Sequence, residues 1–397
     1  MGRLSLMLVL ILQSVSPAVH ANPTLEDGLA RQPVFERLDK TLGDALQEWS
    51  LVPGHAVALV GPQGVVWSKG YGHADLEAGR PMTADTPLLL ASVSKTLIAA
   101  AIMSEHEAGR LQPDQPINEL LPFAVRNPHA PQEAIRLWHL AAHSSGVLDH
   151  PVFYEQGNYA FGGDASMTLE AWLRSYLFEG EERYDAELNF ADRLPGEQRE
   201  YSNVGASLAA FVTAQTAGVP YHELLQDRFF QPLNMGKTHF FIRDFGPNEL
   251  AVPYFWDEEK EKLTRGEHYG GATYPDGWLR SSVNDMGNFV AMMINRGELL
   301  GQRVLTPASV AAIETELAPE GEADGETQAW FWSRKFNGKA LVHSGYDYGT
   351  STYIFYFPER GMGGVVVSNS NGRGTGAMRM ISLQALTDAM AELAELP

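Results

Sequence analysis

Apolar and polar positions follow two different periods near the N-terminus. Residues 33–50, PVFERLDKTLGDALQEWS, place apolar side chains every three or four positions, which is the spacing of an amphipathic helix. Two valine-rich runs follow in HAVALVGPQGVVWSKGYG, on either side of Gly-Pro-Gln-Gly at 61–64. Strand-forming runs around such a turn predict a β-hairpin.

The middle of the chain has a helical pattern, and the C-terminal part returns to strands. Gly- and Pro-rich connections separate the helix candidates, which are residues 94–107, 169–177, 204–217, 222–230 and 283–295. Asn337-Gly338 then lies between two apolar–polar runs, which is a strong hairpin signal, and a second hairpin turns at 358–363. Residues 377–396 close the chain as a predicted helix.

Strands at both ends and helices between them predict an α+β fold of two lobes. We expect one antiparallel sheet built from both chain ends and flanked by the first and last helices, beside an all-helical lobe. The sheet lobe would take residues of about 22–90 and 300–397, and the helical lobe residues of about 91–299. A cleft between the lobes is the expected place for a site.

The first 21 residues have the pattern of a secretory signal peptide. A positive charge at Arg3 precedes the apolar run LSLMLVLIL, and Val19-His20-Ala21 forms a small-x-small cleavage pattern. An uncleaved anchor is the alternative, but the run is short for a membrane span. We therefore predict a periplasmic or secreted protein of residues 22–397. No later stretch is apolar enough for a span, so we expect no stable membrane insertion.

Composition narrows the classes of partner. The chain has no cysteine, which excludes a lipid-modified cysteine anchor, disulfides, a cysteine nucleophile and thiolate metal sites. Its 29 basic and 49 acidic residues give a formal charge of −20. This charge argues against nucleic acid and anionic lipid as partners. The sequence does not indicate an oligomeric state.

The run LLLASVSKTLIAAAIM places a lysine inside an apolar helix candidate. Ser92 and Lys95 are three residues apart, so on a helix they share one face with about 5–6 Å between their Cβ atoms. A serine hydroxyl needs a base to become a nucleophile, and desolvation would favour the neutral amine that can act as this base. The alternative is that Ser92 caps the helix and Lys95 points to solvent.

Two further triplets carry suitable polar groups. Tyr201-Ser202-Asn203 precedes a helix candidate; the phenol could relay a proton, and the Asn203 amide could bind a substrate carbonyl and orient the lysine. His343-Ser344-Gly345 ends a predicted strand, where polar side chains could bind a substrate carboxylate and Gly345 could admit substrate backbone. The backbone N–H groups of Tyr346 and Ser92 could form an oxyanion hole. Taken singly, the first triplet is more simply an ordinary helix start with a cap, and the second a plain turn with a surface histidine.

Together and in this order, the three motifs are those of the serine acyl-transferring enzymes. The chain resembles the serine β-lactamase and penicillin-binding protein superfamily, in its branch of class C β-lactamases, D-alanyl-D-alanine carboxypeptidases and related esterases. SVSK at 92–95 and the Tyr-x-Asn form at 201–203 are typical of this branch. The segments IRLWHLAAHSSGV, PGEQREYSNVGASLAAF and FFQPLNMGKTHF are also similar, with Asn234 where the family usually has glycine.

The resemblance implies a β-lactamase/transpeptidase-like fold and a role for each motif residue. Ser92 would be the acylated nucleophile, and Lys95 with Tyr201 the general-base pair. Asn203, His343, Ser344 and Gly345 would contact the substrate. His343 stands where class C β-lactamases have lysine, which puts β-lactam hydrolysis in doubt, because histidine is less reliably cationic at neutral pH.

Other candidate sites are less complete. His139 and His143 have the i, i+4 spacing of a metal pair, but they lack a zincin glutamate and a third ligand, so we expect a structural role at the turn 144–146. NGRGTGA at 371–377 loosely matches a dinucleotide loop, yet its neighbours are antiparallel hairpins, so we expect a loop that borders the cleft. No Gly-x-Ser-x-Gly elbow occurs. We predict no metal and no cofactor.

The sequence therefore predicts a serine hydrolase that cleaves an amide or ester bond through a Ser92 acyl-enzyme. By resemblance, a D-amino-acid peptide is the favoured substrate. The alternatives are a carboxylesterase with weak or no β-lactamase activity, and a penicillin-binding sensor that does not turn over its ligand. The partner is then a small peptide, ester or β-lactam.

Overall fold

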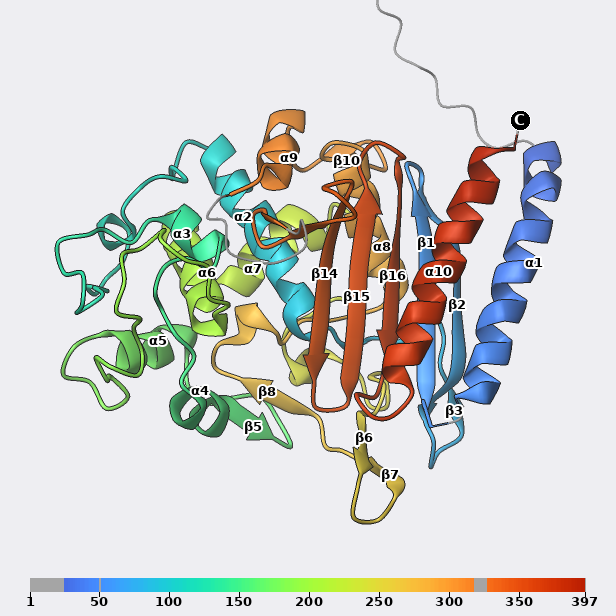
Figure 1. The fold of residues 1–397 in the computed structure, drawn as a ribbon, viewed down its shortest axis with the longest axis horizontal. Helices are drawn as coiled ribbons and strands as arrows, with labels where there is room; N and C mark the ends of the chain where they lie inside the picture. Colours follow the sequence, from blue (N-terminus) through green and yellow to red (C-terminus); the bar gives the residue numbers. More distant parts are fainter. Residues whose placement is uncertain (1–24, 50, 318–326, 397) are drawn as a thin grey trace, which may run out of the picture.

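The computed structural model of the chain describes residues 25–49, 51–317 and 327–396. The predicted signal peptide at 1–21 lies outside these residues, so its removal and the predicted export stay predictions. Among the described helices, none combines the length and the apolar character that a membrane crossing requires. Figure 1 shows two parts side by side: an antiparallel sheet with helices on its faces, and a mostly helical part.

The two ends of the chain meet in one antiparallel sheet, as predicted. His55 pairs with Ser368 and Val60 with Gly363, so β1 lies between β2 and β16 and joins the first hairpin to the last one. The sheet has the strand order β12 (Thr327–Gln328), β13 (Ser333–Lys335), β14 (Ala340–Asp347), β15 (Thr350–Phe357), β16 (Met362–Ser368), β1 (Gly54–Gly61), β2 (Gly64–Asp75) and β3 (Arg80–Pro81).

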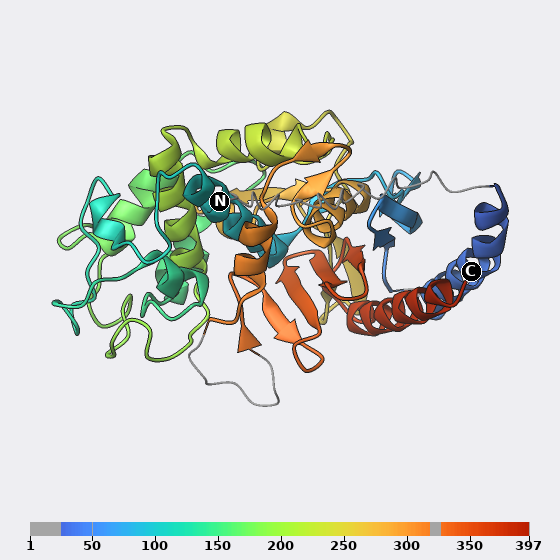
Figure 2. The same ribbon diagram turned by 90° about the horizontal axis from the view of Figure 1, so that it is seen from above.

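Both faces of the sheet are covered, which explains why β1 is buried along its whole length. Its Val57 and Leu59 face α1 (Leu25–Glu48) and α10 (Thr375–Ala394), which pack side by side on one face. Its Ala56, Ala58 and Val60 belong to the core on the other face, against which α8 (Val283–Ile294) packs. This alternation is the period of two that side chains have along a strand. Figure 2 shows α1 and the helical part at opposite ends of the molecule.

The helical part is organised around α2 and α6, which contact each other. Both helices are buried on all sides, which is why their sequences read as continuous apolar runs rather than as amphipathic patterns. The helices of this part are α2 (Thr96–Glu107), α3 (Leu137–Ala141), α4 (Pro151–Asn158), α5 (Leu169–Leu177), α6 (Asn203–Ala217), α7 (Tyr221–Leu225) and α9 (Pro307–Glu314).

The part expected to be all helical also contains short strand pairs, which is a correction to the prediction. They are β4 (Leu88–Leu89) with β9 (Arg280–Ser281), β5 (Tyr159–Phe161) with β8 (Tyr269–Gly271), β6 (Tyr254–Asp257) with β7 (Lys262–Arg265), and β10 (Glu298–Leu299) with β11 (Gln302–Arg303). Runs of two to four residues are too short to show a strand period in the sequence, so these pairs were missed. The lobe boundaries near residues 90 and 300 stay a prediction.

Candidate active site

The segment that carries Ser92 is a 3₁₀ helix, Ala91–Lys95, which joins β4 to α2. The sequence predicted that an α-helix begins at residue 94; α2 itself begins at Thr96. Ala91 has a φ of 47°, a left-handed conformation that is strained for a residue with a side chain. The hydroxyls of Thr350 and Thr352 on β15 donate to the carbonyls of Leu89 and Leu90, at 2.7 Å each. The sheet therefore holds the strained turn in place.

Ser92 and Lys95 lie over each other because residues three apart eclipse in a 3₁₀ helix. Lys95 Nζ lies 3.2 Å from Ser92 Oγ, and it donates to Asn203 Oδ1 and to the carbonyl oxygen of Asp276, both at 2.6 Å. The side chain is fully buried. The amide and carbonyl oxygens can only accept, so they occupy two of the three positions around Nζ. The third position faces the Ser92 hydroxyl, to which a neutral amine would present its lone pair.

Ser94, the other serine of the motif, has a structural role. Its buried hydroxyl donates to the carbonyl of Ala91 at 2.7 Å and accepts from the Leu279 N–H at 3.2 Å. These bonds connect the 3₁₀ helix to the segment before β9. Ser94 therefore does not compete with Ser92 for the role of nucleophile.

Tyr201 lies beside the lysine. Lys95 Nζ is 5.0 Å from the centroid of its ring, and the ring packs on His143 with 4.4 Å between the centroids. About a third of Tyr201 is exposed, at 36%. The ring is thus in the site that the motif predicts, while its role in proton transfer stays a prediction.

Asn203 owes its position to Asp149, which the sequence analysis missed. The Asp149 carboxylate accepts from Ser202 Oγ at 2.8 Å, from the Asn203 N–H at 2.6 Å and from the Val204 N–H at 3.0 Å. It thereby satisfies the N-terminus of α6, whose first turn contains no acidic residue of its own. Burial raises the pKa of this carboxyl, and the three donors oppose that shift.

A second missed carboxyl, Asp276, lies under Lys95. Besides its carbonyl bond to Lys95, it accepts from the Tyr154 hydroxyl at Oδ1, at 3.1 Å, and from the Ser207 hydroxyl at Oδ2, at 2.9 Å. Burial raises the pKa of Asp276 to about 7, although the Lys95 charge opposes the shift. This residue connects α4 and α6 to Lys95.

Replacing Asp276 by asparagine is expected to change how stability depends on pH. Since the pKa of the folded carboxyl lies above its usual value, unfolding releases a proton between about pH 4 and pH 7, and wild-type stability falls as the pH rises through this range. This group alone would lower the unfolding free energy of the wild type by roughly 2–3 kcal/mol between pH 5 and pH 8. Asp276→Asn has no carboxyl at this position, so its unfolding free energy should not show this fall. Denaturant unfolding at several pH values measures the difference between the two proteins.

The control for that experiment is Asp192→Asn, which changes a carboxylate that is 90% exposed. Its unfolding free energy should follow the wild-type pH dependence. Parallel curves for Asp276→Asn and wild type would show that the buried carboxyl does not titrate in this range.

The half of β14 beyond its pairing with β13 presents His343 and Gly345 to the segment that carries Ser92. Their cross-strand partners, Ile354 and Thr352, face the helical part, so the side chain of His343 and the side-chain position of Gly345 lie on this face. A Cβ on Gly345 would come within 3.1 Å of Ser92 N and would clash with the Leu90 carbonyl. Glycine is therefore needed for the contact between β14 and the nucleophile segment, and admission of substrate backbone there stays a prediction.

His343 is neutral in this environment. Burial lowers its pKa to about 3, and the charges of Lys95 and Arg199 act in the same direction. Its Nδ1 lies 2.8 Å from the carbonyl oxygen of Ser344, so Nδ1 carries the proton and donates. A neutral imidazole supplies no positive charge for a substrate carboxylate.

Ser344 and Tyr346 alternate with His343 along β14, and both are exposed. Their cross-strand partners are Tyr353 and Ser351, on the sheet face that α10 covers. The Tyr346 hydroxyl donates to the carbonyl of Asn371 at 2.9 Å, so the loop predicted at 371–377 lies at this end of the strand; it ends at Gly374, because α10 begins at Thr375 and not at 377 as predicted. The substrate contact of Ser344 and the oxyanion hole of Ser92 and Tyr346 stay predictions.

In both histidines of the i, i+4 pair, for which the sequence analysis expected a structural role, the Nδ1 atom accepts a backbone hydrogen bond. His139 Nδ1 accepts from the Arg136 N–H at 3.0 Å, and His143 Nδ1 accepts from the Ser202 N–H at 3.2 Å. His143 therefore holds the Tyr201–Asn203 motif, rather than the turn at 144–146 that the sequence suggested. In the described part of the chain, no three histidine or acidic side chains are grouped to bind a metal ion.

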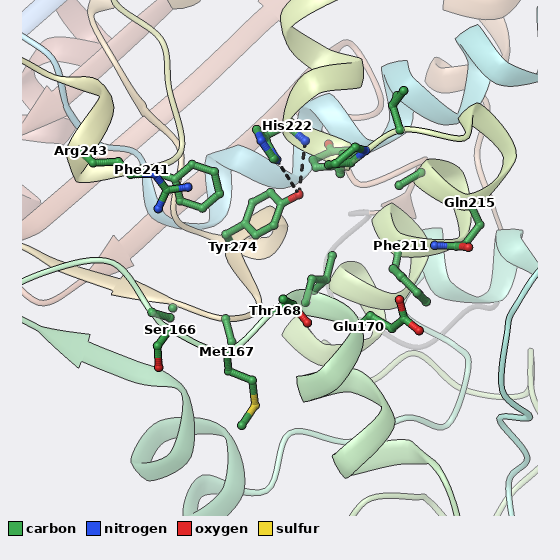
Figure 3. A pocket seen from close by; sticks show the side chains of 18 of the residues that line it. Ser166, Met167, Thr168, Glu170, Phe211, Gln215, His222, Phe241, Arg243 and Tyr274 are labelled. Atoms are coloured by element: carbon green, nitrogen blue, oxygen red, sulfur yellow. Dashed lines mark hydrogen bonds between the residues drawn. The ribbon is translucent and has the colours of Figure 1, made fainter.

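One cavity lies next to Tyr346, and another lies in the helical part. The first, of about 780 Å³, includes Tyr346 in its lining, together with Phe161, Phe255, Trp256, Tyr269, Tyr348 and Asn371. The second, of about 700 Å³, is shown in Figure 3, where His222 contacts the Tyr274 hydroxyl and Arg243 lies beside Phe241. None of the predicted site residues lines this second cavity.

Several known proteins are similar to this chain in sequence and in fold. A family model described as Beta-lactamase matches residues 43–389. Esterase EstB of Burkholderia gladioli is 32% identical over 228 residues, which are 55% of this chain and 54% of the esterase, so the chain spans about half of that protein. The octameric penicillin-binding protein homologue from Pyrococcus abyssi has a TM-score of 0.74 at 27% identity, over 89% of this chain and 77% of that one.

A D-amino acid amidase from Ochrobactrum anthropi, solved with L-phenylalanine amide, has the same fold. Its TM-score is 0.71 at 20% identity, over 90% of this chain and 100% of the amidase. At this identity the likeness extends to the fold alone.

Proposed function

Because the chain belongs to the beta-lactamase family and is a serine hydrolase, we propose that it cleaves an amide or ester bond through an acyl-enzyme on Ser92. The observation that carries the proposal is the position of Lys95. Its buried Nζ donates hydrogen bonds to Asn203 and to the Asp276 carbonyl. The third position around Nζ faces Ser92 Oγ, at 3.2 Å.

In the proposed reaction, Ser92 Oγ attacks the carbonyl carbon while its proton passes to Lys95 Nζ. The N–H groups of Ser92 and Tyr346 bind the oxyanion. The proton then passes to the leaving nitrogen or oxygen, with Tyr201 as relay, and the bond to the leaving group breaks. A water molecule attacks the acyl-enzyme and gives its proton to the same base, and Ser92 leaves with its hydroxyl restored.

The favoured substrate class is a D-amino-acid peptide or amide. The shared fold of the D-amino acid amidase is compatible with it, but does not establish it. The neutral state of His343 argues against substrates that need a cation for a carboxylate, such as β-lactams. A carboxylesterase is the second candidate, because a relative that is 32% identical over 228 residues, EstB, is an esterase. Export, with removal of residues 1–21, is part of the proposal on the sequence pattern alone.

One panel of substrates tests the proposal: nitrocefin, a D-Ala-D-Ala peptide, a D-amino-acid amide and a p-nitrophenyl ester, each with wild type and Ser92→Ala. We expect Ser92-dependent turnover of the amide and the ester, and little turnover of nitrocefin. Turnover of the ester alone would favour the carboxylesterase. Acylation of Ser92 without release would instead indicate a penicillin-binding sensor.

A further inference from the structure

Asp347 is the last residue of β14, on the strand face that meets the nucleophile. It follows Gly345 by two residues, which is about 7 Å along a strand. Its cross-strand partner Thr350 donates to the Leu89 carbonyl, just as Thr352, the partner of Gly345, donates to the Leu90 carbonyl. The carboxyl therefore belongs to the same face as Gly345, beside the segment that carries Ser92.

The hydrogen bonds of Asp347 all come from neutral groups. The Tyr159 hydroxyl donates to it at 3.2 Å and the Tyr348 N–H donates at 2.7 Å, while the Tyr269 hydroxyl donates to the Tyr348 carbonyl at 2.7 Å. In residues 25–49, 51–317 and 327–396, no ion pair involves this carboxyl. Burial raises the pKa of Asp347 to about 6, so the group is mainly ionised at pH 7. A partly buried anion without a cationic partner is unfavourable, and a bound cation would relieve this.

Aromatic rings surround the carboxyl. Tyr159 lies 5.8 Å from both Tyr269 and Tyr348, measured between ring centroids, and Phe161 lies 6.0 Å from Tyr348. Phe161 and Tyr348 are large aromatic side chains left more than half exposed, at 59% and 54%. Ring faces attract a cation, so rings next to a carboxylate are a suitable environment for an ammonium group.

The cavity of about 780 Å³ continues from these rings. Phe161, Tyr269 and Tyr348 belong to both, and Phe255 and Trp256 of the β6–β7 hairpin complete an apolar wall. The two arginines that line the cavity are already in ion pairs: Arg265 with Asp75 at 2.9 Å, and Arg373 with Glu258 at 3.0 Å. The cavity thus suits a flat apolar group better than a carboxylate.

We propose that Asp347 and its surrounding tyrosines bind the protonated amino group of the substrate, and that the adjoining cavity binds its aromatic side chain. This inference rests on the proposed acyl-enzyme at Ser92, which places the scissile carbonyl beside Gly345. The substrate is then an amide, ester or peptide whose acyl part is an unblocked aromatic amino acid. Cleavage follows the first residue of such a peptide, rather than preceding a terminal carboxylate.

A ligand pair tests the subsite without any turnover. At pH 7, 2-phenylethylamine is a cation, while 2-phenylethanol has nearly the same shape and no charge. We expect calorimetry with the wild type to show binding of the amine at least tenfold tighter than of the alcohol. Asp347→Asn should bring the two affinities within about twofold, and Asp192→Asn should keep the wild-type difference. Equal affinities in the wild type would overturn the proposal.

A substrate pair tests the same group during catalysis. The p-nitrophenyl esters of D-phenylalanine and of 3-phenylpropionic acid differ only in the amino group. We expect the wild type to prefer the amino ester at least tenfold in kcat/KM, and Asp347→Asn to reduce that preference at least tenfold. An equal loss of kcat/KM for both esters in a folded Asp347→Asn variant would contradict the proposal. Should Asp347→Asn not fold, Tyr159→Phe, which removes one donor to the carboxylate, should reduce the preference in the same direction.

Different results would overturn the acyl-enzyme and the amine subsite. Ester turnover that persists in Ser92→Ala would overturn the proposed function, and the calorimetric pair would still decide the role of Asp347. Turnover that depends on Ser92 but shows no preference for the amino ester would overturn the amine subsite and leave the acyl-enzyme in place.

Discussion

Ser92→Ala is expected to lower kcat by at least about 10⁴-fold on any substrate the enzyme turns over, since loss of a serine nucleophile costs about 10⁶-fold in subtilisin. The reason is geometric: Lys95 Nζ lies 3.2 Å from the Ser92 hydroxyl, whereas the Ser94 hydroxyl is bonded to Ala91 and to Leu279. A fluorophosphonate probe should therefore add mass to Ser92, and fragmentation of the labelled peptide should place the adduct on that residue.

The control is Ser94→Ala, which lies in the same peptide. It should keep the adduct at Ser92 and should lose about 1–2 kcal/mol of stability, because a buried hydroxyl with two partners is removed. An adduct that survives in Ser92→Ala, or that disappears in Ser94→Ala while the protein stays folded, would contradict the assignment.

Lys95→Ala is expected to slow acylation by about 10³-fold or more, since positioned general bases contribute about 10²–10⁴-fold. The substitution removes the group that faces Ser92 Oγ and leaves the acceptors of Asn203 and Asp276 unpaired. The rate constant for fluorophosphonate labelling, measured at equal probe concentration, reports this loss directly. A small primary amine added to Lys95→Ala should restore part of the rate, because it can occupy the space left by the side chain.

The control is Lys95→Met, which fills that space without a basic nitrogen. It should be as slow as Lys95→Ala and should not respond to the added amine. A loss below about tenfold in both variants would mean that Lys95 is not the base. In that case Tyr201→Phe should carry the large effect.

The fold was largely predictable because its main strands lie next to strong turns. β1 and β2 flank Gly61–Gly64, and β15 and β16 flank the turn at 358–361, so each pair could be found from a short stretch of sequence. The pairing of β1 with β16 followed from having strands at both chain ends. The 3₁₀ helix at Ala91–Lys95 could not be anticipated, since contacts from β15 and from Leu279 hold it.

The site was predictable only as far as its motifs extend. Ser92, Lys95 and Asn203 come together as expected, because their motifs encode that contact. Asp149 and Asp276 were missed, since each meets its partner across 53 residues or more of the chain. An isolated aspartate in a loop has no local sign of such a role. Its burial beside a helix N-terminus or a lysine becomes visible only in three dimensions.

The pairing of β1 with β16 has a consequence for the order in which the protein forms. The first hairpin, β1 and β2, is complete early in synthesis, yet the other edge of β1 has no partner until Ser368 and its neighbours are made. At about 5–20 residues per second, the intervening stretch of about 300 residues takes roughly 15–60 s to leave the ribosome. An apolar strand with an open edge is prone to aggregate during that interval. We therefore expect the nascent chain to need a chaperone until its last strand emerges.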